Sequence, residues 1–158
     1  MSVPSLRVRR SYRQIIHADP DTVFPLLCPV REGEWLDEWH YTMIHSTSGL
    51  AEEGAVFSTP SEDEADTIWI VTRHDSRMHR VEFARVTPDS RASVLKIHVR
   101  ERDANSSFVE IMYIYTGLSD HGNRFIDAYT EELFRAMVTW WEKSMNYYLA
   151  TGKKLLKK

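Results

Sequence analysis

The longest regular pattern in the chain is an apolar stripe of helical period between about residues 121 and 150. At 100° per residue, one side of such a helix carries Phe125, Tyr129, Leu133, Ala136, Met137, Trp140, Ser144, Tyr147 and Tyr148. The opposite side carries Asp127, Glu131, Glu132, Arg135, Thr139, Glu142 and Asn146. This pattern is typical of a surface helix that packs one face against a core.

The ends of this helix have their own signals. Thr130 can cap its main segment, and Glu131 and Glu132 follow in the first turn, where the helix dipole favours acidic side chains. Gly152 suits the position just after the last turn. We therefore predict the main helix over residues 131–149 and a loose basic tail over residues 153–158.

The rest of the chain reads mainly as strands. Residues 7–17 alternate weakly and predict a first strand, which Asp19-Pro20-Asp21 ends before two short helices or tight turns. Strand-like runs then follow at residues 41–46, 55–59, 67–74, 78–87, 92–102 and 107–118. The turns between the long runs are hairpin-like, which indicates an antiparallel meander.

Alternation within the long strands assigns their faces. Apolar residues share one parity at Val81, Phe83, Leu95, Ile97, Val99, Val109, Ile111, Tyr113 and Tyr115. Charged residues occupy much of the other parity, as in an antiparallel sheet that is wet on one side. The C-terminal helix is the expected cover of the apolar face, so the predicted fold class is α+β.

Composition says more about the class of protein and its cellular location than about its chemistry. With 158 residues and a net charge of −3, we expect a single domain over residues 1–158 with no general attraction to nucleic acid or anionic membranes. The single cysteine, Cys28, rules out an internal disulfide and suits a reducing cytosol. No stretch approaches the ~20 apolar residues of a membrane span. A soluble, cytoplasmic protein is the expectation.

The order of elements and several motifs resemble the START-like superfamily, also called SRPBCC, and particularly its polyketide cyclase/dehydrase-like branch. The resembling stretches are Cys28-Pro29-Val30-Arg31-Glu32-Gly33-Glu34-Trp35, Tyr113-Ile114-Tyr115-Thr116-Gly117-Leu118-Ser119, Gly122-Asn123, Trp140-Trp141-Glu142 and Tyr148-Leu149-Ala150-Thr151-Gly152. The resemblance implies a helix-grip fold: a curved antiparallel sheet of about six to seven strands, wrapped on a long C-terminal helix, with two short helices after the first strand. It also implies a cavity between sheet and helix, whereas periodicity alone equally allows a packed core.

Aromatic residues are the first candidates for a ligand site. Trp35, Trp39, Trp69, Phe83, Tyr113, Tyr115, Tyr129 and Trp140, together with Leu133 and Met137 of the helix stripe, are the predicted lining. Ligand sites are mostly apolar with a few orienting polar groups. Each of these residues taken alone is better explained as core. As a set, their hydroxyl and indole N–H groups favour a pocket slightly.

The turn Arg31-Glu32-Gly33-Glu34 is a second candidate, which the resemblance places near the cavity mouth. Arg31 would hold a ligand carboxylate and Glu34 would act as a base. The favoured alternative is an ion pair of Arg31 with Glu34 or Glu32 that fixes the turn.

Other chemistries lack support in the sequence. The seven histidines have no zinc-ligand spacing, although His74 and His79 flank one turn and His40 and His45 bracket another strand. No nucleophile elbow or glycine-rich phosphate loop occurs, so neither a metal nor a cofactor is expected. Basic residues at 73, 77, 80, 91, 100 and 102 share their strands with Glu82, Glu101 and Glu110, which favours a solvated charged face over a nucleic-acid surface.

Three functions follow in order of preference. The first is binding or transport of a small hydrophobic or aromatic ligand, such as a lipid or a polyketide-like metabolite. The second is a cyclase/dehydrase-type enzyme that acts in the same cavity, with catalytic residues that the sequence does not identify. The third is a protein-interaction module of the chaperone-ATPase-activator type. Stable membrane insertion is not expected, and the sequence leaves a homodimer open.

Overall fold

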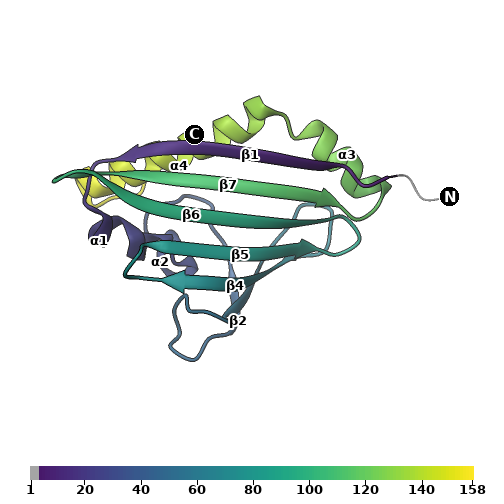
Figure 1. Ribbon diagram of the computed structural model, residues 1–158, viewed down its shortest axis with the longest axis horizontal. Helices are drawn as coiled ribbons and strands as arrows, with labels where there is room; N and C mark the ends of the chain where they lie inside the picture. The colour runs from purple at the N-terminus through teal and green to yellow at the C-terminus, as the bar shows by residue number, and fades with distance from the viewer. Residues whose placement is uncertain (1–3) are drawn as a thin grey trace.

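A computed structural model of the protein describes residues 4–158 (Figure 1). The elements are β1 Arg7–Ile16, α1 Pro20–Val23, the 3₁₀ helix η1 Phe24–Leu27, α2 Pro29–Glu32, β2 Thr42–His45, β3 Val56–Thr59, β4 Thr67–Asp75, β5 Arg80–Thr87, β6 Arg91–Asp103, β7 Ser106–Gly117, α3 Asp120–Ala128 and α4 Glu131–Thr151. This order confirms the predicted strand, short helices, meander and C-terminal helix.

The strands form one seven-stranded antiparallel sheet in the order β1-β7-β6-β5-β4-β3-β2. Consecutive strands from β2 to β7 are neighbours, which is the predicted meander, and β1 joins it beside β7. Figure 1 shows α4 running behind the sheet near β1 and β7, with α1 and α2 at one end. The sheet and α4 therefore enclose the interior from two sides.

The predicted inner face of the sheet is confirmed. Val81, Val99 and Val109 are almost completely buried, and Tyr113 and Tyr115 of β7 are also buried. On β1 the inward parity brings Gln14 and Ile16 into the core, where the Gln14 amide donates to the Val138 carbonyl oxygen of α4 at 2.8 Å. This bond ties the middle of α4 directly to β1.

The predicted phase of the C-terminal helix is only partly right: Ser144 of the predicted stripe is buried and Met137 and Trp140 are half-buried, but the centre of the buried face is displaced. Phe134, Val138 and Met145 are its buried apolar residues, whereas Leu133, expected on the inner stripe, is 54% exposed. The stripe was extended from Phe125 through Tyr129, but α3 ends at Ala128 and α4 begins at Glu131. Because the helix is interrupted there, the phase of α3 does not carry into α4.

Both predicted ends of α4 are confirmed. The Thr130 hydroxyl accepts a hydrogen bond from the Leu133 amide, and Gly152 adopts the left-handed conformation at φ 72°. Beyond Gly152, the tail that we expected to be loose is attached to the domain. Leu155 bridges to Leu36, and the Lys157 amide donates to the Asp37 carboxylate at 2.9 Å.

Two other observations concern the chain as a whole. Cys28 is buried and accepts a hydrogen bond from the Ala51 amide at 3.3 Å. Within residues 4–158, none of the helices is long and apolar enough to cross a bilayer.

Candidate functional site

An enclosed space lies between the sheet and α4, and its walls are largely aromatic. We call it the central cavity; its volume is about 50 Å³, and its lining includes Trp35, Trp39, Trp69, Phe83, Tyr113 and Trp141. Small-molecule sites usually measure roughly 300–1,000 Å³. The interior is therefore closely packed, with room for a few water molecules or part of a ligand.

Three indole N–H groups around the central cavity, those of Trp35, Trp39 and Trp69, have protein partners. Trp35 donates to the Leu26 carbonyl oxygen at 2.8 Å, and Trp39 donates to the Pro29 carbonyl oxygen at 2.9 Å. Trp69 donates to the Thr59 hydroxyl at 2.9 Å. These tryptophans therefore offer a ligand their ring faces and edges, and not the free donors that their composition had suggested.

Glu32, at the end of α2, adds an acidic group to the central cavity. Its side chain is half-buried, and it lies among the mostly apolar residues that line the cavity. Burial there raises its pKa to about 8. Glu32 is consequently protonated at neutral pH, and it can both donate and accept a proton close to that pH.

A cationic group lies at the other end of the inner sheet face. Arg85 occupies an inward position of β5, and its guanidinium carbon lies 4.2 Å from the ring centre of Trp69 and 5.4 Å from that of Tyr113. It donates to the Ser93 hydroxyl at 3.1 Å and, at 3.5 Å, to the Tyr115 hydroxyl. Its buried Nε has no hydrogen-bond partner among the described residues.

Arg85 opens on one side to a groove of about 690 Å³, which we call the Arg85 groove. The walls are the 59–67 segment, Arg91 of β6, and His121, Arg124 and Phe125 of α3. Because Arg85 contacts Trp69 and Tyr113, which line the central cavity, its side chain separates the cavity from the groove.

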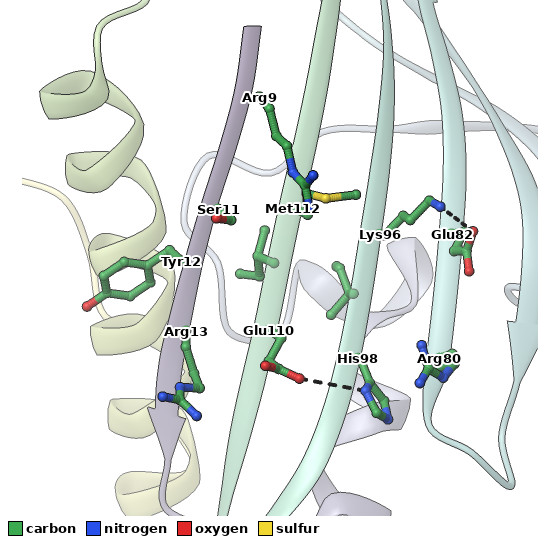
Figure 2. A pocket seen from close by; sticks show the side chains of 12 residues that line it. Arg9, Ser11, Tyr12, Arg13, Arg80, Glu82, Lys96, His98, Glu110 and Met112 are labelled. Atoms are coloured by element: carbon green, nitrogen blue, oxygen red, sulfur yellow. Dashed lines mark ion pairs between the residues drawn. The ribbon is translucent and has the colours of Figure 1, made fainter.

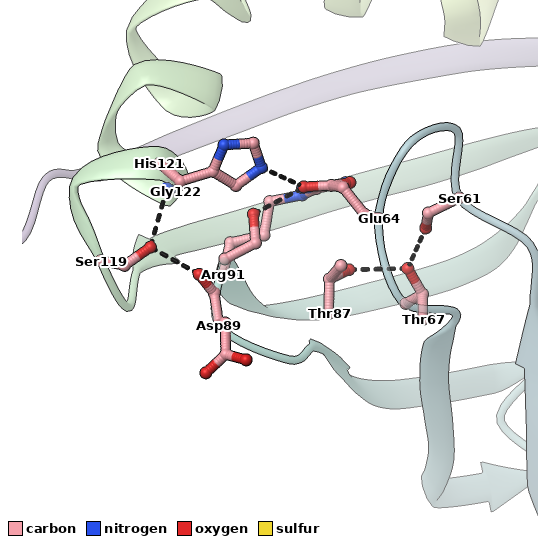
Figure 3. A network of polar contacts seen from close by, with 10 residues as sticks. Ser61, Glu64, Thr67, Thr87, Asp89, Arg91, Ser119, His121 and Gly122 are labelled. Atoms are coloured by element: carbon pink, nitrogen blue, oxygen red, sulfur yellow. Dashed lines mark hydrogen bonds and ion pairs between the residues drawn. The ribbon is translucent and has the colours of Figure 1, made fainter.

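A polar network fixes the wall of the Arg85 groove (Figure 3). Glu64 accepts from Arg91 at 3.0 Å and contacts His121 at 2.7 Å. Burial opposes ionisation of Glu64, but hydrogen bonds from His121 and Arg91 outweigh it and hold its pKa below the usual range. The N-terminus of α3 is fixed close by, because any side chain at Gly122 would collide with the Ser90 carbonyl oxygen.

The structure divides the predicted ligand residues among several places. Five line the central cavity: Trp35, Trp39, Trp69, Phe83 and Tyr113. Tyr115 contacts Arg85, and Tyr129 packs against Tyr115 with ring centres 5.3 Å apart. Met137 and Trp140 instead line an outer groove of about 510 Å³ beside α4, the α4 groove, which also includes Leu36, Trp39 and Trp141. Leu133 faces solvent.

The Arg31–Glu34 turn takes the arrangement that we favoured. The two side chains form an ion pair with Nε and Oε2 2.8 Å apart, and the Tyr148 hydroxyl donates to the same carboxylate at 2.8 Å. The Arg31 hydrogen bond holds the pKa of Glu34 below its usual range. The turn is therefore fastened to the end of α4, with both charges already partnered.

Two residues of the candidate site were missed in the sequence. Arg85 shares the parity of Val81 and Phe83, so a charged residue at an inward position was a detectable signal. The sequence pattern indicates Glu32 only as a possible partner of Arg31. It lies three residues before Trp35 and four before Leu36, both buried, which could have placed it towards the interior.

The outer face of the sheet carries charges of both signs (Figure 2). Glu82 pairs with Lys96 at 3.8 Å and with Arg73 at 3.3 Å, and Glu110 pairs with Arg100 at 2.7 Å. Arg91 is not part of this face, since it lines the Arg85 groove.

Among the described residues, no cluster of three or more His, Cys, Asp or Glu is arranged to hold a metal ion.

No family model and no curated protein matches the sequence at a significant level. Solved structures do share its architecture. Norcoclaurine synthase from Thalictrum flavum, a point mutant in complex with a transition-state analogue, has a TM-score of 0.66 and 13% identity over 94% of this chain and 99% of its own. The Zhui aromatase/cyclase from Streptomyces sp. R1128 has a TM-score of 0.65 and 8% identity over 95% and 100%. Ara h 8.0201 has a TM-score of 0.64 and 10% identity over 92% and 99%. At these identities the likeness shows the fold alone.

Proposed function

From the helix-grip fold of the START-like superfamily, which this chain adopts, we propose that the protein binds a small apolar or aromatic molecule between its sheet and α4. The observation that carries the proposal is the enclosed central cavity, whose walls combine aromatic rings with the acidic group of Glu32. The fold neighbours, which include a polyketide aromatase/cyclase, agree with ligand binding or cyclisation as the role of this interior.

A cavity of about 50 Å³ holds only part of such a molecule, so binding requires side chains to move. Leu36, Trp39 and Trp141 line both the central cavity and the α4 groove. They form a thin wall, and Trp39 and Trp141 are only partly buried. Rotation of these two rings would join the two spaces and admit a ligand.

Native mass spectrometry of the freshly purified protein, followed by titration with a neutral apolar dye, tests this proposal. We expect a co-purified small molecule or saturable dye uptake. Leu95→Phe, which adds bulk at a buried position of the cavity wall, should weaken dye uptake severalfold. Leu133→Phe is the matched control, because Leu133 is exposed and should leave uptake unchanged. A wild-type protein that carries no small molecule and takes up no dye contradicts the proposal.

A second candidate function is an enzyme that moves protons in the same cavity. Glu32 favours it, since a carboxyl with a pKa of about 8 can protonate a substrate oxygen in its acid form and accept a proton from an adjacent carbon as carboxylate. Glu32→Gln separates the two functions, because glutamine keeps the size and polarity but cannot exchange a proton. If the protein is an enzyme, this variant should retain dye uptake and lose deuterium exchange from D₂O into a bound aromatic ketone. Exchange at the wild-type rate would exclude Glu32 as the catalytic group.

A further inference from the structure

Arg85 carries a permanent positive charge at the interior end of β5. Its neighbours on the inward face of that strand, Phe83 and Thr87, are both buried. The guanidinium lies 4.2 Å from the ring centre of Trp69, and arginine remains protonated at every physiological pH. A core of this kind would ordinarily have an apolar residue at the position of Arg85.

The hydrogen-bonding capacity of Arg85 is only partly used. Its contacts are two neutral hydroxyls, those of Ser93 and Tyr115, and its buried Nε is unpaired among the described residues. No carboxylate within residues 4–158 forms an ion pair with it, and Glu64 nearby is engaged by Arg91 and His121. A partly buried cation without a counter-charge is unfavourable for folding. Its presence points to a partner from outside the chain.

The Arg85 groove is large enough to hold such a partner, and two more arginines line it. Its volume of about 690 Å³ is within the usual range for small-molecule sites. Arg91 and Arg124 line it as well, and Phe125 provides an apolar wall against which Arg91 is stacked at 3.4 Å. Glu62 and Asp63 also line the groove, but they are exposed on the 59–67 segment, where solvent screens their charges.

We propose that Arg85 binds the carboxylate of a small aromatic acid whose ring occupies the Arg85 groove beside Phe125. The planar guanidinium matches a carboxylate in shape and carries the opposite charge, and it can form a two-point contact with such a group. This inference deepens the proposed function and rests on it only for the aromatic character of the ligand. The acid group would be held outside the central cavity, at the Arg85 side chain that separates cavity and groove.

Calorimetric titration with two matched probes tests the inference. The probes are 2-naphthoate and 2-naphthalenemethanol, which share a ring system and differ in charge. We expect the wild type to bind the carboxylate more tightly than the alcohol. Arg85→Met removes the charge and keeps an apolar chain over Trp69, and it should weaken naphthoate binding by about tenfold or more while leaving the alcohol unchanged.

Two further measurements separate a binding role from a structural one. The melting temperature of Arg85→Met should equal or exceed that of the wild type, because an uncompensated charge is removed. A purely structural Arg85 would instead give a lower melting temperature. Arg124→Gln is the control within the groove; Arg124 is exposed, so its loss should weaken naphthoate only slightly and only at low salt.

Three results would overturn the inference: a wild type that binds neither probe, equal affinity for both, or full naphthoate affinity in Arg85→Met. The dye experiment has a separate outcome. Naphthoate selectivity without uptake of the neutral dye would refute binding in the interior and leave the carboxylate site standing. Uptake of the dye without selectivity for the carboxylate would refute the carboxylate site and leave binding in the interior standing.

Discussion

The carboxyl of Glu32 is held in its uncharged form at neutral pH by the apolar side chains around it. Its folded-state pKa of about 8 lies above its ordinary value of 4.5. The folded protein therefore binds more protons than the unfolded chain between these two values. In this window Glu32 makes the fold less stable as the pH rises, and above about pH 8 its effect levels off.

Glu32→Gln should accordingly be more stable than the wild type at pH 8, by about 1–3 kcal/mol, and similar to it at pH 4.5. Urea unfolding at several pH values across that window measures the difference. Glu62→Gln, an exposed substitution of the same kind, serves as the control and should show no such gain. A constant difference between Glu32→Gln and the wild type at all pH values would contradict the assigned environment of this carboxyl.

At the scale of elements, the face of α4 that packs on the sheet is the most consequential assignment. Phe134 is fully buried and contacts Tyr113 and Tyr129 with its ring, whereas its neighbour Leu133 is more than half exposed. Phe134→Ala should therefore cost about 3–5 kcal/mol in the free energy of unfolding. Leu133→Ala should change it by less than about 0.5 kcal/mol.

Chemical denaturation of these two variants compares adjacent positions in one helix. Both substitutions introduce alanine, which has the highest helix propensity, so neither loss would reflect helix formation itself. The difference reports which face is buried. Similar losses at the two positions, or a larger loss at Leu133, would place α4 in the orientation that its stripe alone predicted.

The ends of α4 were predictable, whereas its phase was predicted only in part, for a physical reason. Caps are local: Thr130 and Gly152 act on groups within a few residues. The phase of α4 is set by its own residues, whereas the predicted stripe continued the positions of Phe125 and Tyr129 across the break between Ala128 and Glu131. Tyr129 and Thr130 fit the helical pattern of apolar and polar residues, although neither residue is helical in the structure.

At the scale of the whole molecule, the alternation of apolar residues was enough to predict the sheet and its inner face. Each strand places every second side chain inward, so Phe83 and Tyr113 could be assigned before any contact was known. The site was less predictable because it depends on packing across elements. The sequence does not reveal that the indole of Trp69 is already hydrogen-bonded to Thr59, or that Arg85 has no acidic partner within residues 4–158.

Two side chains of α4 also complete the open edge of β1. Glu142 accepts from the Ile15 amide at 2.6 Å, while Asn146 accepts from the His17 amide at 2.8 Å and donates to the Ile15 carbonyl oxygen at 3.0 Å. They make the bonds that an additional strand would make. At the opposite edge, β2 is only four residues long. The β1 edge of the sheet is thus partly covered by side chains of α4, and the edge strand β2 is short. Both features protect the folded protein from edge-to-edge aggregation.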